Sequence, residues 1–177
     1  MKALYILLLL TAQLLTAQSA QVRTNTLSAK AAEAYAIKSE SKVNEFYNYI
    51  EILSDPRLKQ DMKLHTAKEA MKLFQSEGIV IPNIIDKVHR DITLADLLEQ
   101  ISSYKNKLSI KVNFFNSFPE TKSDGREDWN LAYEVEINGR LTVTVTQKFH
   151  IVLEDKKFGK TVQKVWNTYL GEITVIQ

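Results

Sequence analysis

The strongest constraint on the fold is a pair of alternating segments joined by Asn138-Gly139. Apolar or aromatic residues occupy every second position from Trp129 to Ile137, and the alternation resumes after the dipeptide and continues to Leu153. A period of two places neighbouring side chains on opposite faces of a strand. Asn-Gly accepts the positive φ that a two-residue type I′ turn requires at both positions. The sequence therefore predicts a long antiparallel hairpin with one buried face.

The first twenty residues predict a targeting segment. Lys2 precedes an uninterrupted apolar run at positions 3–10, and small residues follow at 16–20, which is the pattern of a signal peptide. A membrane-spanning helix needs about 20 apolar residues, and polar residues from Thr11 onward interrupt this run. We therefore expect export to the periplasm or beyond, with cleavage before Gln21 and no transmembrane anchor in the mature chain.

Composition limits what the mature chain can be. It contains no cysteine, which excludes disulfides, thiolate metal sites and a lipid on an N-terminal cysteine. The net charge is +2 and the charged residues are interspersed, so we expect no nucleic-acid partner. Residues 21–177 have the length of a single domain with a core of ordinary size.

Three helices are predicted ahead of the long strands. The first covers Leu27–Leu53, the second begins with Asp55 as N-cap and Pro56 at the first helical position, and the third is capped by Thr93. Each carries apolar residues at steps of three and four, which gives it one buried stripe. The expected stripes are Val43, Phe46, Ile50 and Leu53; Leu64, Ala67, Met71 and Phe74; and Leu94, Leu97, Leu98 and Ile101.

Other strands are predicted on both sides of the hairpin. The β-branched stretch 79–91 contains Pro82, which cannot donate to a ladder, so it is an edge or broken strand. A regular strand follows at Leu108–Phe118, with a polar loop at 119–126. A charged turn at 154–160 leads to the last strand, Thr161–Ile176.

The last strand changes phase at Gly171. Trp166 and Leu170 are in phase with each other, whereas Ile173 and Val175 beyond the glycine fall on the other parity. One extra residue in one strand produces such a change. The sequence therefore predicts a β-bulge at Leu170-Gly171 that bends the sheet.

This order of elements resembles the nuclear transport factor 2-like superfamily, also called cystatin-like or SnoaL-like. Segments 44–56 (NEFYNYIEILSDP), 79–98, 147–149 and 157–173 are similar to exported members from Bacteroidota. The resemblance implies an α+β fold, in which a curved, mainly antiparallel sheet wraps around the N-terminal helices as a cone with an internal cavity. The superfamily hosts isomerases, dehydratases, ligand-binding modules and interaction modules, so it does not select among them.

The predicted interior lacks the groups that acid–base catalysis needs. Isomerases and dehydratases of this kind use an inward acid or base with an oxyanion stabiliser, and no inward strand position is Asp, Glu or His. The polar exceptions are Asn116, Tyr133 and Gln147, and Trp166 would form an aromatic wall beside them. The side-chain amides of Asn116 and Gln147 each have two possible roles. Each either hydrogen-bonds to the backbone at a sheet irregularity or lines a water-filled cavity that accepts a ligand.

The remaining candidate sites are weaker. His65, His89 and His150 fall in unrelated elements and are expected at the surface, and the acidic stretches 124–128 and 154–155 lack a calcium-loop pattern. No metal or cofactor is predicted. The sequence favours an exported, non-catalytic module that binds a small apolar ligand or docks on another cell-envelope protein. An isomerase-like or dehydratase-like enzyme and an immunity-type protein remain alternatives.

The outer face of the hairpin bears on oligomeric state. It carries glutamates, threonines, Lys148 and His150, with Phe115 and Ala132 as apolar interruptions. Buried centres of obligate dimer interfaces are depleted of charge. We therefore expect a monomer, or at most a weak dimer through this face.

Overall fold

The computed structural model describes residues 28–76, 78–85, 90–121 and 127–176. The chain divides into two compact units, residues 1–32 and 33–177, and the architecture below is that of the second. Helix α2 (Ala29–Leu53) starts in the first unit, where the Ser28 side chain accepts a hydrogen bond from the Ala31 amide at 3.2 Å. The predicted targeting segment and Leu27 lie outside the described residues.

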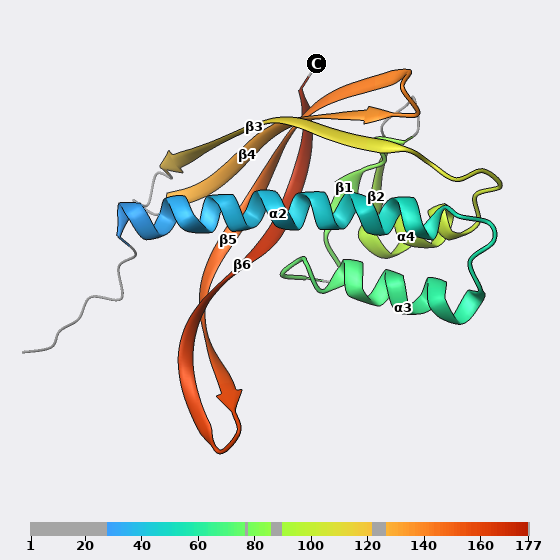
Figure 1. The fold of residues 1–177 in the computed structure, drawn as a ribbon. Helices are drawn as coiled ribbons and strands as arrows, with labels where there is room; N and C mark the ends of the chain where they lie inside the picture. The colour runs from blue at the N-terminus through green and yellow to red at the C-terminus, as the bar shows by residue number, and fades with distance from the viewer. Residues whose placement is uncertain (1–27, 77, 86–89, 122–126, 177) are drawn as a thin grey trace, which may run out of the picture. The chain divides into compact units, whose positions relative to one another are not determined.

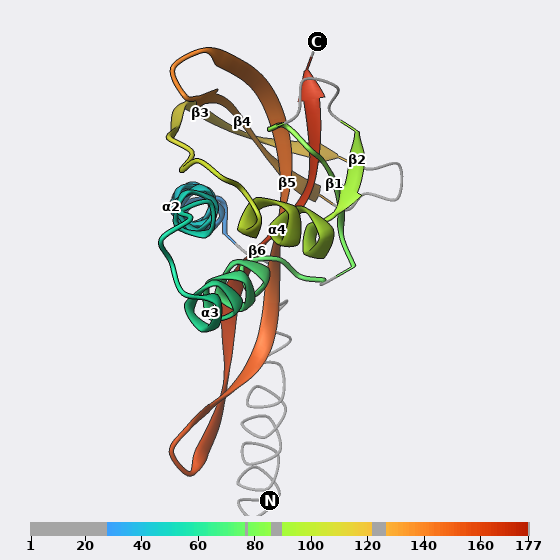
Figure 2. The ribbon, with the colours of Figure 1, turned by 90° about the vertical axis from the view of Figure 1, so that its right-hand side faces the viewer.

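Residues 33–177 form an α+β unit, as the sequence predicts. Helices α3 (Gln60–Met71) and α4 (Leu94–Ser102) flank a small two-stranded sheet, β1 (Val80–Pro82) and β2 (Asp91–Thr93). The main sheet has the order β3-β4-β5-β6 and is antiparallel throughout. Its strands are Ile110–Thr121, Glu127–Ile137, Leu141–Phe158 and Thr161–Ile176. Figure 1 shows these strands curling past helix α2, and Figure 2 shows the same sheet with α2 seen end-on.

The central hairpin is confirmed in turn and register. Asn138 and Gly139 have φ values of 53° and 64°, and β4 pairs with β5 without a break from Trp129 opposite Phe149 to Ile137 opposite Leu141. Every second side chain is buried, as the alternation predicts. These buried positions are Leu131, Tyr133, Val135, Ile137, Val143, Val145, Gln147 and Phe149.

The helices complete the core from one side. The predicted stripe of α2 is buried, and the Phe46 ring lies 5.0 Å from that of Phe74 with an edge-on geometry. The stripe of α4 is buried too. The cap of α4 is also confirmed, because Thr93 Oγ1 accepts from the Asp96 amide at 3.1 Å.

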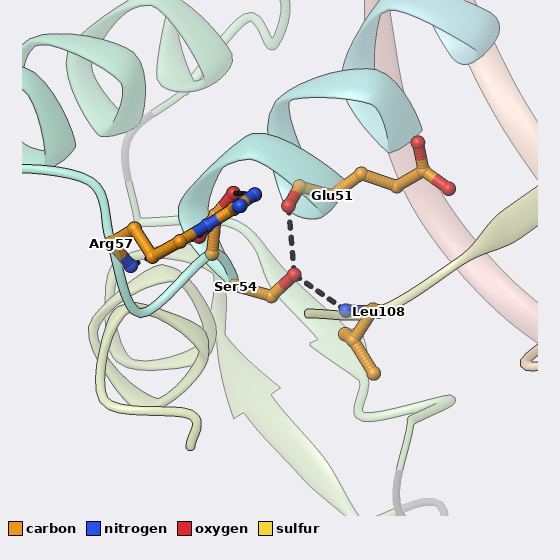
Figure 3. A network of polar contacts seen from close by, with 5 residues as sticks. Glu51, Ser54, Arg57 and Leu108 are labelled. Atoms are coloured by element: carbon orange, nitrogen blue, oxygen red, sulfur yellow. Dashed lines mark hydrogen bonds and ion pairs between the residues drawn. The ribbon is translucent and has the colours of Figure 1, made fainter. Parts of the chain in front are cut away.

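A buried serine connects the end of α2 to the start of β3 through hydrogen bonds (Figure 3). Ser54 Oγ donates to the carbonyl of Glu51 at 2.7 Å and accepts from the Leu108 amide at 2.8 Å. The Glu51 carboxylate accepts from the amide of Ile110. Two backbone donors at the start of β3 are therefore satisfied by side chains from the C-terminal end of α2.

The second helix departs from the prediction. It begins at Gln60 rather than at Pro56, because Asp55 accepts from the Arg57 amide at 2.9 Å and pairs with its guanidinium at 2.8 Å, which holds a turn. The predicted stripe lies only partly in the core, because Phe74 is buried and Ala67 and Met71 are half-buried against it. Leu64 is 57% exposed, whereas Lys63 and Ala70 are buried.

The long strands run further than predicted. Strand β3 continues through Pro119 to Thr121, where a loop was expected, and residues 122–126 lie outside the described chain. The charged stretch 154–158 continues β5, which leaves only Gly159 and Lys160 as the turn. The prediction of a broken strand at 79–91 is confirmed by β1 and β2, with 86–89 outside the description.

Two bulges interrupt the main sheet. In β6, three residue steps from Leu170 to Ile173 oppose two steps in β5, which confirms the predicted bulge at Gly171. In β3, the three steps from Asn113 to Asn116 oppose two in β4. The second bulge was not foreseen, and it reverses the faces of the residues that follow it.

Candidate binding site

Two of the four predicted site residues meet in the interior. The Tyr133 hydroxyl donates to Gln147 Oε1 at 2.7 Å, and the Tyr47 hydroxyl lies 3.4 Å from the Tyr133 hydroxyl. Because a phenol has one proton and that of Tyr133 is used on Gln147, Tyr47 is the donor in the second bond. All three side chains are buried. We call this group the tyrosine–glutamine cluster.

The cluster is anchored at the bulge of β6. Gln147 Nε2 donates to the Gly171 carbonyl at 3.3 Å, so the amide bonds backbone at a sheet irregularity, one of the two arrangements that the sequence allows. The strands approach closely there, since a Cβ on Gly171 would lie 2.7 Å from His150 Nε2 and 3.1 Å from Lys148 Cβ. Glycine is therefore needed at this position for space.

Burial sets the chemistry of the cluster. It raises the pKa of Tyr47 and raises that of Tyr133 well above the usual range, and the neighbouring Tyr47 adds to the second effect. Both phenols are accordingly neutral near pH 7. A neutral phenol paired with an amide can orient a polar group, but it accepts a proton poorly.

The other two predicted site residues lie elsewhere. Asn116 was predicted to point inward and is exposed, because the β3 bulge places it opposite Ala132 on the outer face. The same shift turns Phe115 inward, where its ring lies 5.5 Å from that of Tyr133. The inward prediction for Phe114 lies outside the described side chains. Trp166 is half-buried opposite Leu153, and its carbonyl accepts from the Tyr35 hydroxyl at 3.4 Å.

An open groove lies between α3 and α4, with a volume of about 270 Å³. Its floor is apolar, because α3 contributes the stripe that the sequence assigned to the core. We call it the helix-pair groove. Its lining residues are Gln60, Lys63, Leu64, Ala67, Met71, Ala95, Leu98, Glu99 and Ser102. The spacing of Leu64, Ala67 and Met71 was the signal for it, but periodicity does not distinguish a covered stripe from an uncovered one.

The polar groups of the groove are arranged at its rim. Lys63 is buried and donates through Nζ to the Ser102 carbonyl. This bond connects α3 to α4 and gives a hydrogen-bond donor to a carbonyl at the C-terminal end of α4. Glu99 is exposed on the same side of α4. The groove thus presents an apolar floor with the exposed carboxylate of Glu99 beside it, and it suits an apolar group that carries a cation nearby.

In the described part of the chain, no group of three or more His, Asp or Glu side chains is placed to hold a metal ion, and no helix has the length and apolar content to cross a bilayer. His65 is exposed near Glu69, His150 is half-buried on β5, and His89 lies outside the description.

Searches against protein families, curated proteins and solved structures returned no match to this chain.

Proposed function

We propose that the chain is an exported, non-catalytic module that docks on another cell-envelope protein through the helix-pair groove. The observation that carries this proposal is the incompletely covered stripe of α3: Leu64 is 57% exposed, Ala67 and Met71 are half-buried, and all three line the groove. Single exposed apolar residues are ordinary, but a hollow lined by several of them is typical of a binding surface. Export is proposed from Lys2 and the apolar run after it.

The partner proposed for the groove is an amphipathic helix. Leu64, Ala67 and Met71 lie at steps of three and four on α3, and α4 contributes Leu98 on the other side. A third helix that lays its apolar residues between two helices is a common recognition mode. The exposed Glu99 at the rim favours a lysine or arginine next to those apolar residues.

The open shape of the groove favours a protein partner over a free small molecule. Pockets for drug-sized ligands usually enclose most of the ligand, whereas this groove is open. The second candidate, a small apolar ligand inside the cone, has less support. Tyr133 and Gln147, the interior groups expected to hold such a ligand, bond each other instead.

The superfamily and the other functions also remain proposals. Kinship with the nuclear transport factor 2-like superfamily is supported by the α+β architecture with helices against a curled antiparallel sheet. An isomerase-like or dehydratase-like activity would need a proton acceptor beside the neutral phenols of Tyr47 and Tyr133. An immunity-type role would also use a protein-binding surface. We further propose a monomer, or at most a weak dimer, in solution.

Site-specific photo-crosslinking in the exporting cell tests the proposal. A photoreactive phenylalanine analogue at position 64 is expected to capture an envelope protein, and the same analogue at the exposed neighbour His65, which does not line the groove, is not. Ala95→Glu introduces a charge across the groove and should abolish the adduct. Asn106→Glu, which adds the same charge at an exposed loop residue, serves as the matched control.

Three results would contradict the proposal. Equal adducts at positions 64 and 65, or an adduct that survives Ala95→Glu, would show that the groove is not the contact. An adduct whose mass is twice that of the chain would identify a second copy as the occupant. An exported chain whose intact mass retains Met1 would overturn the proposed cleavage.

A further inference from the structure

The hairpin of β5 and β6 continues well past the sheet. Strand β4 pairs with β5 only as far as Phe149, whereas β5 and β6 stay paired to Phe158 opposite Thr161. Nine residues of strand span about 30 Å. Figures 1 and 2 both show this ribbon projecting away from α3 and α4. Every residue from Asp155 to Lys164 is exposed. We call residues 155–164 the hairpin tip.

The hairpin tip is basic and carries exposed apolar groups. Its ten residues include four lysines against one aspartate, a charge of +3 within a chain whose total is +2. The lysines are Lys156, Lys157, Lys160 and Lys164. Phe158 is 48% exposed and Val162 is 63% exposed. Lysines around a protruding aromatic residue are a typical composition of segments that rest on anionic lipid.

The two apolar residues lie on opposite faces of the ribbon. Cross-strand partners share a face, and the face alternates at each step. Phe158 is paired with Thr161, and Val162 is paired with Lys157 one step further on. A flat protein surface would cover one face and leave the other apolar residue in water. A fluid interface that surrounds the tip covers both.

We propose that the hairpin tip docks on an anionic phospholipid surface. Phe158 and Val162 would enter the headgroup region, while the four lysines meet the phosphates around them. This inference is independent of the helix-pair groove, so either proposal can fail alone. Together they describe a module that is held at a membrane surface while its helices bind a protein partner.

A simpler explanation of the lysines is that they protect an exposed strand edge from pairing with another chain. That explanation accounts for the charge but not for Phe158 and Val162, which raise the tendency of an edge to associate. The two explanations differ in what a variant should do. Loss of edge protection increases aggregation, whereas loss of a lipid contact decreases membrane binding.

Vesicle flotation of the exported full-length product tests the proposal. The probes are vesicles with 30% phosphatidylglycerol in phosphatidylcholine and vesicles of phosphatidylcholine alone. Binding is expected on the anionic vesicles and should weaken with added salt. The double variant Lys157→Gln with Lys160→Gln should bind ~25-fold more weakly, at about fivefold for each lysine. Phe158→Ser should bind about tenfold more weakly.

A matched control removes the same charge elsewhere. Lys105→Gln with Lys107→Gln alters two exposed lysines of the loop before β3 and should leave flotation within about twofold of the unaltered chain. Circular dichroism checks that each variant is folded.

If both lysine pairs weaken binding equally, only net charge matters, and the proposal is wrong. If the lysine variant is weakened but Phe158→Ser is not, the tip meets the lipid by charge alone, and the proposed entry of Phe158 into the headgroup region is wrong. Unchanged flotation with increased aggregation would identify the edge-protection role.

Discussion

The sheet interior and the helix pair α3–α4 both carry periodic apolar residues, yet they use them differently. Between β4 and β5 the inward side chains are buried apart from the half-buried Trp129 and Leu141, and the polar groups of Tyr133 and Gln147 bond each other and Gly171. On α3 the periodic stripe is only partly covered: Leu64 is 57% exposed and Ala67 and Met71 are half-buried, while Lys63 is buried and reaches Ser102. The first region stabilises the fold with its apolar residues, and the second leaves them accessible.

This difference separates stability from binding. Residues of the covered interior should control the free energy of unfolding. Residues of the uncovered stripe should affect a partner and leave unfolding nearly unchanged. Substitutions in the two regions therefore test whether the interior and the stripe differ in their effect on unfolding.

The largest effect is expected for Val143→Asp. Val143 is buried opposite Val135, and an unpaired carboxylate there costs several kcal/mol. The adjacent variant Thr144→Asp points to the outer face and should cost about 1 kcal/mol or less, mainly because it opposes Glu134. Thermal or urea unfolding measures both. Equal losses would mean that the hairpin faces are wrongly assigned.

The two bulges explain how far the sequence predicts the fold and the site. At Gly171 the phase change is visible, because apolar residues mark both parities and glycine marks the break. In β3 the pattern contains Phe114, Phe115 and Phe118, so phenylalanine is available on either parity and the bulge leaves no trace. This is why Asn116 was placed on the wrong face, while Tyr133 and Gln147, on the unbroken hairpin, were placed correctly.

Helix α3 shows a second physical limit of prediction. Asp55-Pro56 is a sound helix start in isolation, but Asp55 bonds Arg57 and holds a turn. Lys63 is buried because its long stem packs between helices while its ammonium group reaches a carbonyl. Neither outcome follows from periodicity, since both depend on partners distant in sequence or on competition between local bonds. The helix-pair groove was therefore missed.

Tyr133→Phe should cost about 1–3 kcal/mol. The substitution leaves Gln147 Oε1 without its donor and Tyr47 without its acceptor in a buried site. It should also reduce the fall in the free energy of unfolding at alkaline pH. A tyrosine whose pKa in the folded state is raised above the usual value of about 10 contributes its full stability below about pH 10. That contribution is lost as the pH rises further, by roughly 1.4 kcal/mol per pH unit for each such tyrosine.

Urea unfolding at pH 7 and at pH 10 to 11 measures both parts of the Tyr133 prediction. Tyr35→Phe is the control, since Tyr35 is half-buried and its hydroxyl donates to the Trp166 carbonyl at 3.4 Å. An unchanged alkaline slope in Tyr133→Phe would show that the phenol is not neutralised by burial.

Thr168→Val should stabilise the chain by about 1 kcal/mol. Thr168 is fully buried on β6, and its hydroxyl oxygen has no hydrogen-bond partner in the described structure. Valine has nearly the same shape and removes the unpaired polar group. A rise in the urea midpoint confirms the prediction. A fall of similar size would show that the Thr168 hydroxyl has a hydrogen-bond partner in the folded chain.

The smallest effect is expected where the uncovered stripe lies. Leu64→Glu should change the free energy of unfolding by no more than about 0.5 kcal/mol, because a side chain that is 57% exposed loses little buried area. Ala70→Glu, two turns further along α3 at a fully buried position, should instead cost several kcal/mol. The two variants introduce the same charge into the same helix, so helix propensity and net charge are matched. If Leu64→Glu proves as damaging as Ala70→Glu, the stripe is part of the core and the groove is not a free surface. If it leaves unfolding unchanged and Ala95→Glu removes the crosslink expected from position 64, the apolar residues of α3 serve a partner rather than the fold.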